Sequence, residues 1–145
     1  MKKLFLSLSV LALLTATSCN KNKDDKFTPT KENLTGTYNI TSATYQEGNS
    51  PAVNVFSNTD PSMNWYEPCE RDDEYKLNGD SSFELVDAGT KCTPEGGDSG
   101  TWSLVNSTTI NIDGSDMTIA SFDGKQLVLK YTDSGDTYTT TLVKK

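Results

Sequence analysis

Residues 126–143 read QLVLKYTDSGDTYTTTLV, two alternating stretches joined by Asp-Ser-Gly-Asp at 133–136. In each stretch apolar or aromatic side chains alternate with polar ones, which is typical of strands with one buried face. Asp, Ser and Gly are the residues that turns prefer. The sequence therefore predicts two neighbouring strands, 126–132 and 136–143, that turn the same apolar face toward a core.

The same pattern extends back to residue 34. Short stretches rich in Thr, Tyr, Val, Ile and Leu are separated by Gly, Asn, Asp and Ser, and no segment has useful helical periodicity. The predicted strands cover 34–45, 73–78, 81–87, 100–105, 108–112, 117–122, 126–132 and 136–143. The predicted inward face consists of Leu34, Gly36, Tyr38, Ile40, Tyr75, Leu77, Phe83, Leu85, Trp102, Leu104, Ile110, Ile112, Leu127, Leu129, Tyr131, Tyr138 and Leu142. The sixth strand fits least well, because Ile119 and Phe122 fall on opposite faces.

Eight sequential strands with mostly short connections favour an all-β fold, an eight-stranded antiparallel up-and-down barrel that leaves no open edge. A two-sheet sandwich is the main alternative. In the barrel, the turns at 78–80, 106–107 and 123–124 share the end where the first strand begins, here called the tight end. The segments 46–72, 88–99, 113–116 and 133–136 share the opposite end, here called the mouth.

Residues 1–18 have the order of a signal peptide: Lys2 and Lys3, an apolar stretch from Leu4 to Leu14, then small residues. The apolar stretch is too short to span a bilayer as a mature helix. The junction Ala16-Thr17-Ser18-Cys19 resembles a bacterial lipobox, which implies cleavage before Cys19 and a lipid on its sulfur. The alternative is an ordinary cleaved signal followed by an incidental cysteine. We expect a lipoprotein anchored to the membrane through Cys19.

Residues 19–33 carry charged and polar side chains without apolar periodicity, so we expect a disordered tether before a barrel domain over 34–145. Lys23-Asp24-Asp25 resembles the short signal that sends some outer-membrane lipoproteins to the cell surface, although a solvated charged spacer explains the same residues. We therefore expect a lipid-anchored outer-membrane protein that faces either the periplasm or the cell surface.

Charge and composition exclude several classes of protein. After removal of the signal peptide, 11 basic residues face 20 acidic ones, a net charge of −9, which argues against nucleic-acid binding. The sequence has no histidine, so the Gly-Asp-Ser-Gly at 97–100 cannot act as a serine-protease nucleophile with a histidine base. The Asp pairs at 113/116 and 133/136 are better explained as turn residues than as calcium ligands. We expect no enzyme activity, no metal and no cofactor.

Two cysteines remain for a disulfide once Cys19 carries a lipid, and disulfides persist in exported proteins. Cys69 lies before the second predicted strand and Cys92 after the third, both at the mouth. If Leu77 faces Phe83, Cys69 lies opposite residue 91; a three-residue turn places it opposite residue 89 instead. In either register the two cysteines end close together, so we expect a Cys69–Cys92 disulfide.

The mouth segments are also strongly acidic, because 46–72, 87–99, 113–116 and 133–136 hold twelve acidic residues against Arg71 and Lys91. Such a rim should repel anionic ligands such as free fatty acids and favour neutral or cationic ones.

Three stretches together resemble the lipocalin-like domain of small bacterial lipoproteins, over roughly residues 34–143. They are LTGTYNI at 34–40, CERDDEYKLNGDSSF at 69–83 followed by Cys92, and GTWSL at 100–104. The chain departs from true lipocalins in having Tyr38 where they have Trp, and in lacking a C-terminal helix signal. The resemblance implies a small barrel that can hold an apolar molecule.

We therefore expect the barrel to bind a small apolar or amphipathic molecule non-covalently. The apolar residues of segment 47–68 should cover the mouth as a lid. The expected ligand-binding residues are Tyr38, Tyr75, Phe83, Trp102, Leu104, Tyr131, Tyr138, Phe56 and Trp65. The alternative is a structural or interaction module with a filled barrel, in which the mouth loops, with Trp65 and Tyr66 exposed, contact a protein or glycan. An interior cavity of about 300 Å³ or more would favour the first function.

Overall fold

The computed structural model describes residues 27–145. The predicted signal peptide, the lipidation site Cys19 and the first part of the tether lie outside the described residues. Among the residues that are described, no helix is long and apolar enough to cross a membrane.

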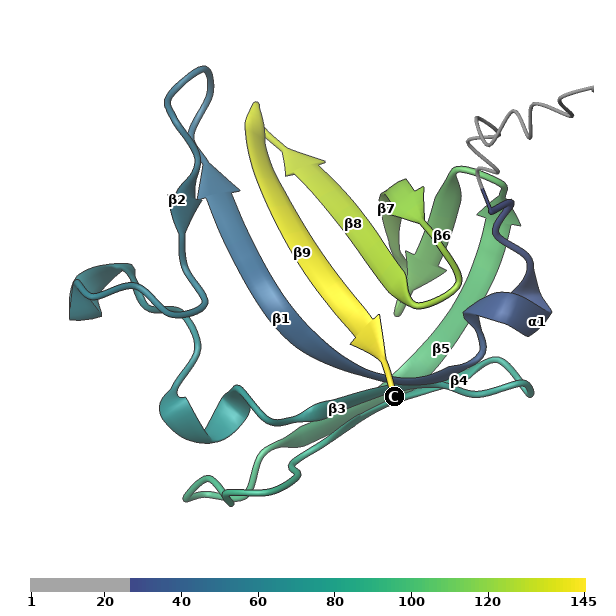
Figure 1. Cartoon of the computed structure of the whole chain (residues 1–145), viewed down its shortest axis with the longest axis horizontal. Helices are drawn as coiled ribbons and strands as arrows, with labels where there is room; N and C mark the ends of the chain where they lie inside the picture. Colours follow the sequence, from purple (N-terminus) through teal and green to yellow (C-terminus); the bar gives the residue numbers. More distant parts are fainter. Residues whose placement is uncertain (1–26) are drawn as a thin grey trace, which may run out of the picture.

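Antiparallel strands make up nearly all of the fold (Figure 1). They are β1 (Gly36–Gln46), β2 (Val53–Asn54), β3 (Glu74–Leu77), β4 (Ser82–Val86), β5 (Gly97–Asn106), β6 (Thr109–Ile112), β7 (Ser115–Phe122), β8 (Gln126–Asp133) and β9 (Asp136–Lys144). Neighbours pair in the order β2-β1-β3-β4-β5-β6-β7-β8-β9, and β1 also pairs with β9. This last pairing closes a barrel of eight strands, with the short β2 added to the free part of one edge of β1.

The predicted barrel is thus confirmed and the sandwich is not the fold. The β3–β4 hairpin has the first of the two registers considered, with Leu77 opposite Phe83 and Tyr75 opposite Leu85. Cys69 and Cys92 form the predicted disulfide, with their Cα atoms 5.3 Å apart.

Bulges explain where the simple alternation breaks down. Ile119 and Phe122 have opposite parity, yet both are buried, because the β7–β8 register shifts between Ile119 and Ser121. A similar shift in β1, between Ile40 and Ser42, turns Ala43 toward the core. One extra residue in a strand re-aims the side chains that follow it.

The strands have unequal lengths, and this shapes the mouth. β1 pairs with β9 as far as Gln46 and Thr137, whereas its pairing with β3 stops at Asn39 and Glu74. The wall made of β8, β9 and β1 therefore extends beyond the short β3–β4 hairpin, as Figure 1 shows. Residues near the mouth ends of these long strands have no wall opposite them, so Tyr131 remains 38% exposed and Tyr138 only partly buried.

The tether prediction is wrong for residues 27–33, which pack against the barrel. Helix α1 (Lys31–Leu34) begins with a capping box between Thr30 and Asn33, and Leu34, predicted as strand, is its fully buried last residue. Phe27 packs edge-on against Phe122, with the ring centroids 5.5 Å apart. In the sequence, the only sign of this helix is the capping pair, Thr30 followed three residues later by Asn33. Four helical residues are too few to show the helical periodicity of apolar side chains.

The two ends of the barrel differ as expected. At the tight end, the Lys31 ammonium donates to the Ser81 hydroxyl in the β3–β4 turn, and Asp123 accepts the backbone N–H groups of Lys125 and Gln126. At the mouth lie the long segments 47–73 and 87–96. In Figure 1, α1 lies at the right and the segment around β2 at the left, at opposite ends of the long axis.

Candidate functional site

The interior of the barrel contains a partly open cavity of about 230 Å³. Its lining comes from β1, β3, β4, β6, β7, β8 and β9, and one further residue comes from the loop before β3. The lining residues are Tyr38, Ile40, Tyr66, Tyr75, Leu77, Phe83, Ile112, Met117, Leu127, Leu129, Thr140 and Leu142. All but four of these side chains are hydrocarbons or thioethers, so the cavity is suited to an apolar molecule.

Three of the nine predicted ligand-binding residues line this cavity: Tyr38, Tyr75 and Phe83. Trp102 instead fills the tight end, where it is 1% exposed and its indole N–H donates to the Asn78 carbonyl at 2.9 Å. Leu104 packs against the core from β5 without lining the cavity. The prediction missed the aliphatic lining of β7 to β9, although Leu127, Leu129 and Leu142 were already placed on the inward face.

The predicted lid residues divide between the core and the surface. Val55 and Phe56 are buried, Tyr66 lines the cavity, and Met63 and Trp65 are exposed. The segment is fixed to the barrel edge by backbone bonds: the Val55 N–H donates to the Ala43 carbonyl at 2.9 Å, and the Trp65 N–H donates to the Val55 carbonyl at 2.9 Å. It therefore packs beside β1 and contributes one residue, Tyr66, to the cavity wall.

Three other predicted ligand-binding residues, Trp65, Tyr131 and Tyr138, gather outside the cavity together with Tyr45. Tyr45 pairs with Tyr138 across β1 and β9, and Tyr138 pairs with Tyr131 across β9 and β8. The Trp65 ring lies 4.9 Å from the ring of Tyr45 and 5.9 Å from that of Tyr138. We call Tyr45, Trp65, Tyr138 and Tyr131 the aromatic row.

A carboxylate fixes one end of the aromatic row. The Tyr45 hydroxyl donates to Asp136 at 2.7 Å, and the same carboxylate accepts the Gly48 N–H at 3.1 Å. The hydrogen bond to Asp136, followed by burial, raises the pKa of Tyr45 to about 12.

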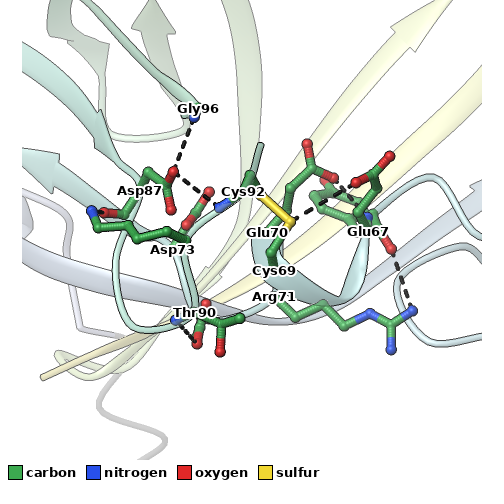
Figure 2. The surroundings of a disulfide bond; sticks show 12 residues. Glu67, Cys69, Glu70, Arg71, Asp73, Asp87, Thr90, Cys92 and Gly96 are labelled. Carbon is green, nitrogen blue, oxygen red and sulfur yellow. Dashed lines mark hydrogen bonds between the residues drawn. A yellow bond between two sulfur atoms is a disulfide. The ribbon is translucent and has the colours of Figure 1, made fainter. Parts of the chain in front are cut away.

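The disulfide joins the turn η2 (Pro68–Glu70) to the loop between β4 and β5 (Figure 2). Carboxylates hold the same loop by accepting its backbone N–H groups. Asp87 accepts from Gly96 at 3.0 Å and from Cys92 at 3.3 Å, Asp73 accepts from Ala88 at 3.1 Å, and Asp72 accepts from Thr90 at 2.9 Å. We call Asp72, Asp73 and Asp87 the acidic latch.

The acidic latch brings buried carboxylates close together, which is electrostatically unfavourable when they are charged. Asp73 and Asp87 are 5% and 3% exposed, and one oxygen each of Asp72 and Asp87 is buried without a hydrogen-bond partner in the described part of the chain. Burial first, and then the charges of Asp87, Asp72 and Glu70, raise the pKa of Asp73 above its ordinary value. The latch holds the loop through the hydrogen bonds described above. Within residues 27–145, no three Asp, Glu, Cys or His side chains are arranged to hold a metal ion.

Arg71 extends away from this cluster toward the chain segment that carries Tyr66. Its guanidinium donates to the Tyr66 carbonyl at 3.3 Å (Figure 2), and the Tyr66 ring packs on Phe56 with centroids 5.2 Å apart. The position of Tyr66 at the cavity wall thus depends on Arg71 and on the disulfide-bridged turn beside it.

The family model of the lipocalin-like domain matches residues 34–129, more than half of the chain. The chain belongs to the lipocalin-like domain family. No curated protein and no solved structure matches it. The match ends within β8, yet β9 beyond it supplies Thr140 and Leu142 to the cavity and closes this lipocalin-like barrel on β1.

Proposed function

We propose that this lipocalin-like protein binds a small apolar or amphipathic molecule non-covalently inside the barrel. The observation that supports this is the cavity of about 230 Å³, which a fully packed interior would not leave. Burial of the ligand's apolar surface supplies the affinity, at about 25 cal/mol per Å². We propose no chemical step, and no cofactor.

The cavity volume limits the size of the ligand. It does not reach the volume of about 300 Å³ given above as favouring a ligand-binding barrel, which is the typical lower limit for drug-sized ligands, so the proposal is restricted to smaller molecules. An apolar cavity of about 150 Å³ holds benzene, and in proportion this one accommodates a molecule of about nine non-hydrogen atoms. A complete long-chain lipid is therefore too large to be enclosed.

Mass spectrometry of the protein purified under native conditions tests this function, because a bound molecule adds its mass to the folded chain. Leu129→Phe adds volume inside the cavity and should abolish the adduct. Val143→Phe adds the same kind of ring to an exposed position on the next strand and should keep it. An adduct of equal abundance in both variants would place the ligand elsewhere.

The membrane anchor and the location are part of the proposal. The lipobox-like junction supports lipidation of Cys19. Phe27, the first residue that the structure describes, packs at the tight end, so the mouth should point away from the membrane. Labelling of cells with an alkyne fatty acid should mark the wild type and not Cys19→Ser. Protease added to intact cells then distinguishes a protein facing the cell surface from one facing the periplasm.

The aromatic row favours a second function, recognition of a protein or glycan partner at the mouth. Trp65 and Tyr131 are 48% and 38% exposed, and large exposed aromatic residues are common in binding surfaces. Trp65→Ala together with Tyr131→Ala should abolish partner binding without affecting a ligand in the cavity. If the double variant lost the small-molecule adduct instead, the row would be part of the ligand site.

A further inference from the structure

Four residues of the cavity wall carry hydroxyl groups: Tyr38, Tyr66, Tyr75 and Thr140. The Tyr38 hydroxyl is already used, because it donates to the Leu34 carbonyl at 2.7 Å. The hydroxyls of Tyr66 and Tyr75 make no hydrogen bond to any residue between 27 and 145, and neither does that of Thr140. The wall of this apolar cavity thus contains polar groups that nothing in the described chain satisfies.

Tyr66 and Tyr75 come from different elements but belong to one region of the wall. Tyr66 lies on the loop before η2, and Tyr75 lies in the middle of β3, beside Phe83 at 6.2 Å between ring centroids. The pKa of Tyr75 is raised chiefly by burial and further by Tyr66, Asp73 and Glu70. The two tyrosines therefore influence each other. The charges that raise the pKa of Tyr75 belong to carboxylates, and the cation in contact with Tyr66, Arg71, bonds to its backbone carbonyl.

These surroundings limit the chemistry of a ligand. An anion at the two tyrosines would be repelled by Asp73 and Glu70, which lie outside the lining but close enough to affect Tyr75. A cation would be desolvated among hydrocarbon side chains, and no carboxylate lines the cavity to pair with it. An uncharged group that accepts and donates hydrogen bonds avoids both of these penalties. It can replace solvent as the partner of the Tyr66 and Tyr75 hydroxyls, which are only partly buried.

We propose that Tyr66 and Tyr75 bind the polar group of an uncharged ligand, phenol-like or alcohol-like, whose apolar body fills the rest of the cavity. This assignment rests on the proposed function, since it names the class of ligand and the residues that select it. Arg71 acts as a positioning residue, because it holds the backbone of Tyr66.

The experiment compares p-cresol with toluene, which has the same ring and methyl group but lacks the hydroxyl. Their dissociation constants are measured by calorimetry on the mature chain carrying Cys19→Ser, so that no detergent competes for the cavity. The variants are Tyr66→Phe, Tyr75→Phe and the double variant. Tyr131→Phe is the matched control, because it removes an exposed hydroxyl outside the cavity.

The measured quantity is the ratio of the affinity for p-cresol to the affinity for toluene. This ratio should be about fivefold or more higher in the wild type than in the double variant, the effect of at least one net hydrogen bond. Tyr131→Phe should keep the wild-type ratio. The carboxylate benzoate, which is small enough for the cavity, should bind at least tenfold more weakly than p-cresol. A ratio unchanged in the double variant, or benzoate binding as tightly as p-cresol, would overturn the assignment while leaving the proposed function intact. Failure of both toluene and p-cresol to bind the wild type would overturn the proposed function as well.

Discussion

Tyr38 connects the first strand of the barrel to the helix that closes its tight end. Its ring is 1% exposed and its hydroxyl donates to the carbonyl of Leu34, the last residue of α1. Burial raises the pKa of Tyr38 to about 12, so the group is a neutral donor throughout the physiological range. Tyr38 occupies the position at which true lipocalins have Trp. Its hydroxyl forms the hydrogen bond to the carbonyl of Leu34, four residues earlier in the chain.

Tyr38→Phe should lower the free energy of unfolding by about 1 to 2 kcal/mol, because it leaves the buried Leu34 carbonyl without its donor. Urea denaturation followed by fluorescence measures this. Tyr131→Phe removes an exposed hydroxyl and should change stability by less than about 0.5 kcal/mol. Equal effects of the two substitutions would show that the Tyr38 bond contributes nothing net.

Asp73 should make stability depend on pH. Its pKa is raised in the folded state, chiefly by burial, so the folded protein binds a proton more readily than the unfolded chain. As pH rises from the ordinary value of 3.8 through the raised value, deprotonation in the folded state therefore costs stability. The contribution is fully present below 3.8 and is lost above the folded pKa.

Asp73→Asn should remove this pH dependence while keeping an oxygen to accept the Ala88 N–H. Relative to the wild type, the variant should gain stability as pH rises from 3.8 toward 7, measured by thermal unfolding at a series of pH values. A difference between the two proteins that is constant across this range would mean that Asp73 titrates normally.

At the scale of elements, the disulfide and the acidic latch together fix the loop between β4 and β5. Cys69→Ser with Cys92→Ser should lower the free energy of unfolding by up to about 3.4 kcal/mol, the chain-entropy value for a loop of this length. Hydrogen exchange should accelerate at 66–73 and 87–97 far more than at 78–81 and 123–125, which lie at the other end. Equal acceleration at both ends would contradict the separation of mouth and tight end.

The elements themselves were largely predictable, because each strand buries one face and alternation records this directly. The exceptions have local physical causes. Strict alternation would place Ile119 and Phe122 on opposite faces of β7, but a bulge between them turns both side chains into the core. Tyr131 and Tyr138 continue the inward pattern past the point where a facing wall exists, so they form a surface cluster. Alternation reports the direction of a side chain and says nothing about what lies opposite.

For the whole molecule, closure depends on β9, which lies beyond the segment matched by the family model. β9 pairs with β1 on one side and β8 on the other. A chain ending at residue 133 should therefore expose an unpaired edge and the buried Leu127 and Leu129, and it should lose its near-UV circular dichroism and aggregate. A soluble, monomeric truncation with the native spectrum would show that β9 is dispensable.

The barrel and its disulfide could be predicted, and the β3–β4 register to within two alternatives, but the cavity only in part. Inward-facing residues were mostly correct, yet Trp102 fills space while Phe83 borders it. That difference arises from the volumes and rotamers of all neighbours together, which no single stretch of sequence specifies. Whether a hydroxyl of the wall has a partner also depends on the surrounding backbone: Tyr38 is fully buried with the Leu34 carbonyl within reach, whereas Tyr75 is partly buried and has no such partner in the described chain.

The last strand also returns to the beginning of the described part of the chain. The Lys144 ammonium donates to the Asn33 carbonyl at 2.9 Å, and the Lys145 N–H donates to the Thr37 carbonyl at 2.9 Å. A short Gly-Ser linker could therefore join Lys145 to Thr30, and new ends could be opened in the exposed stretch around residue 60. Such a circular permutant would be tethered at the mouth instead of the tight end, so that the same barrel could be immobilised in either orientation.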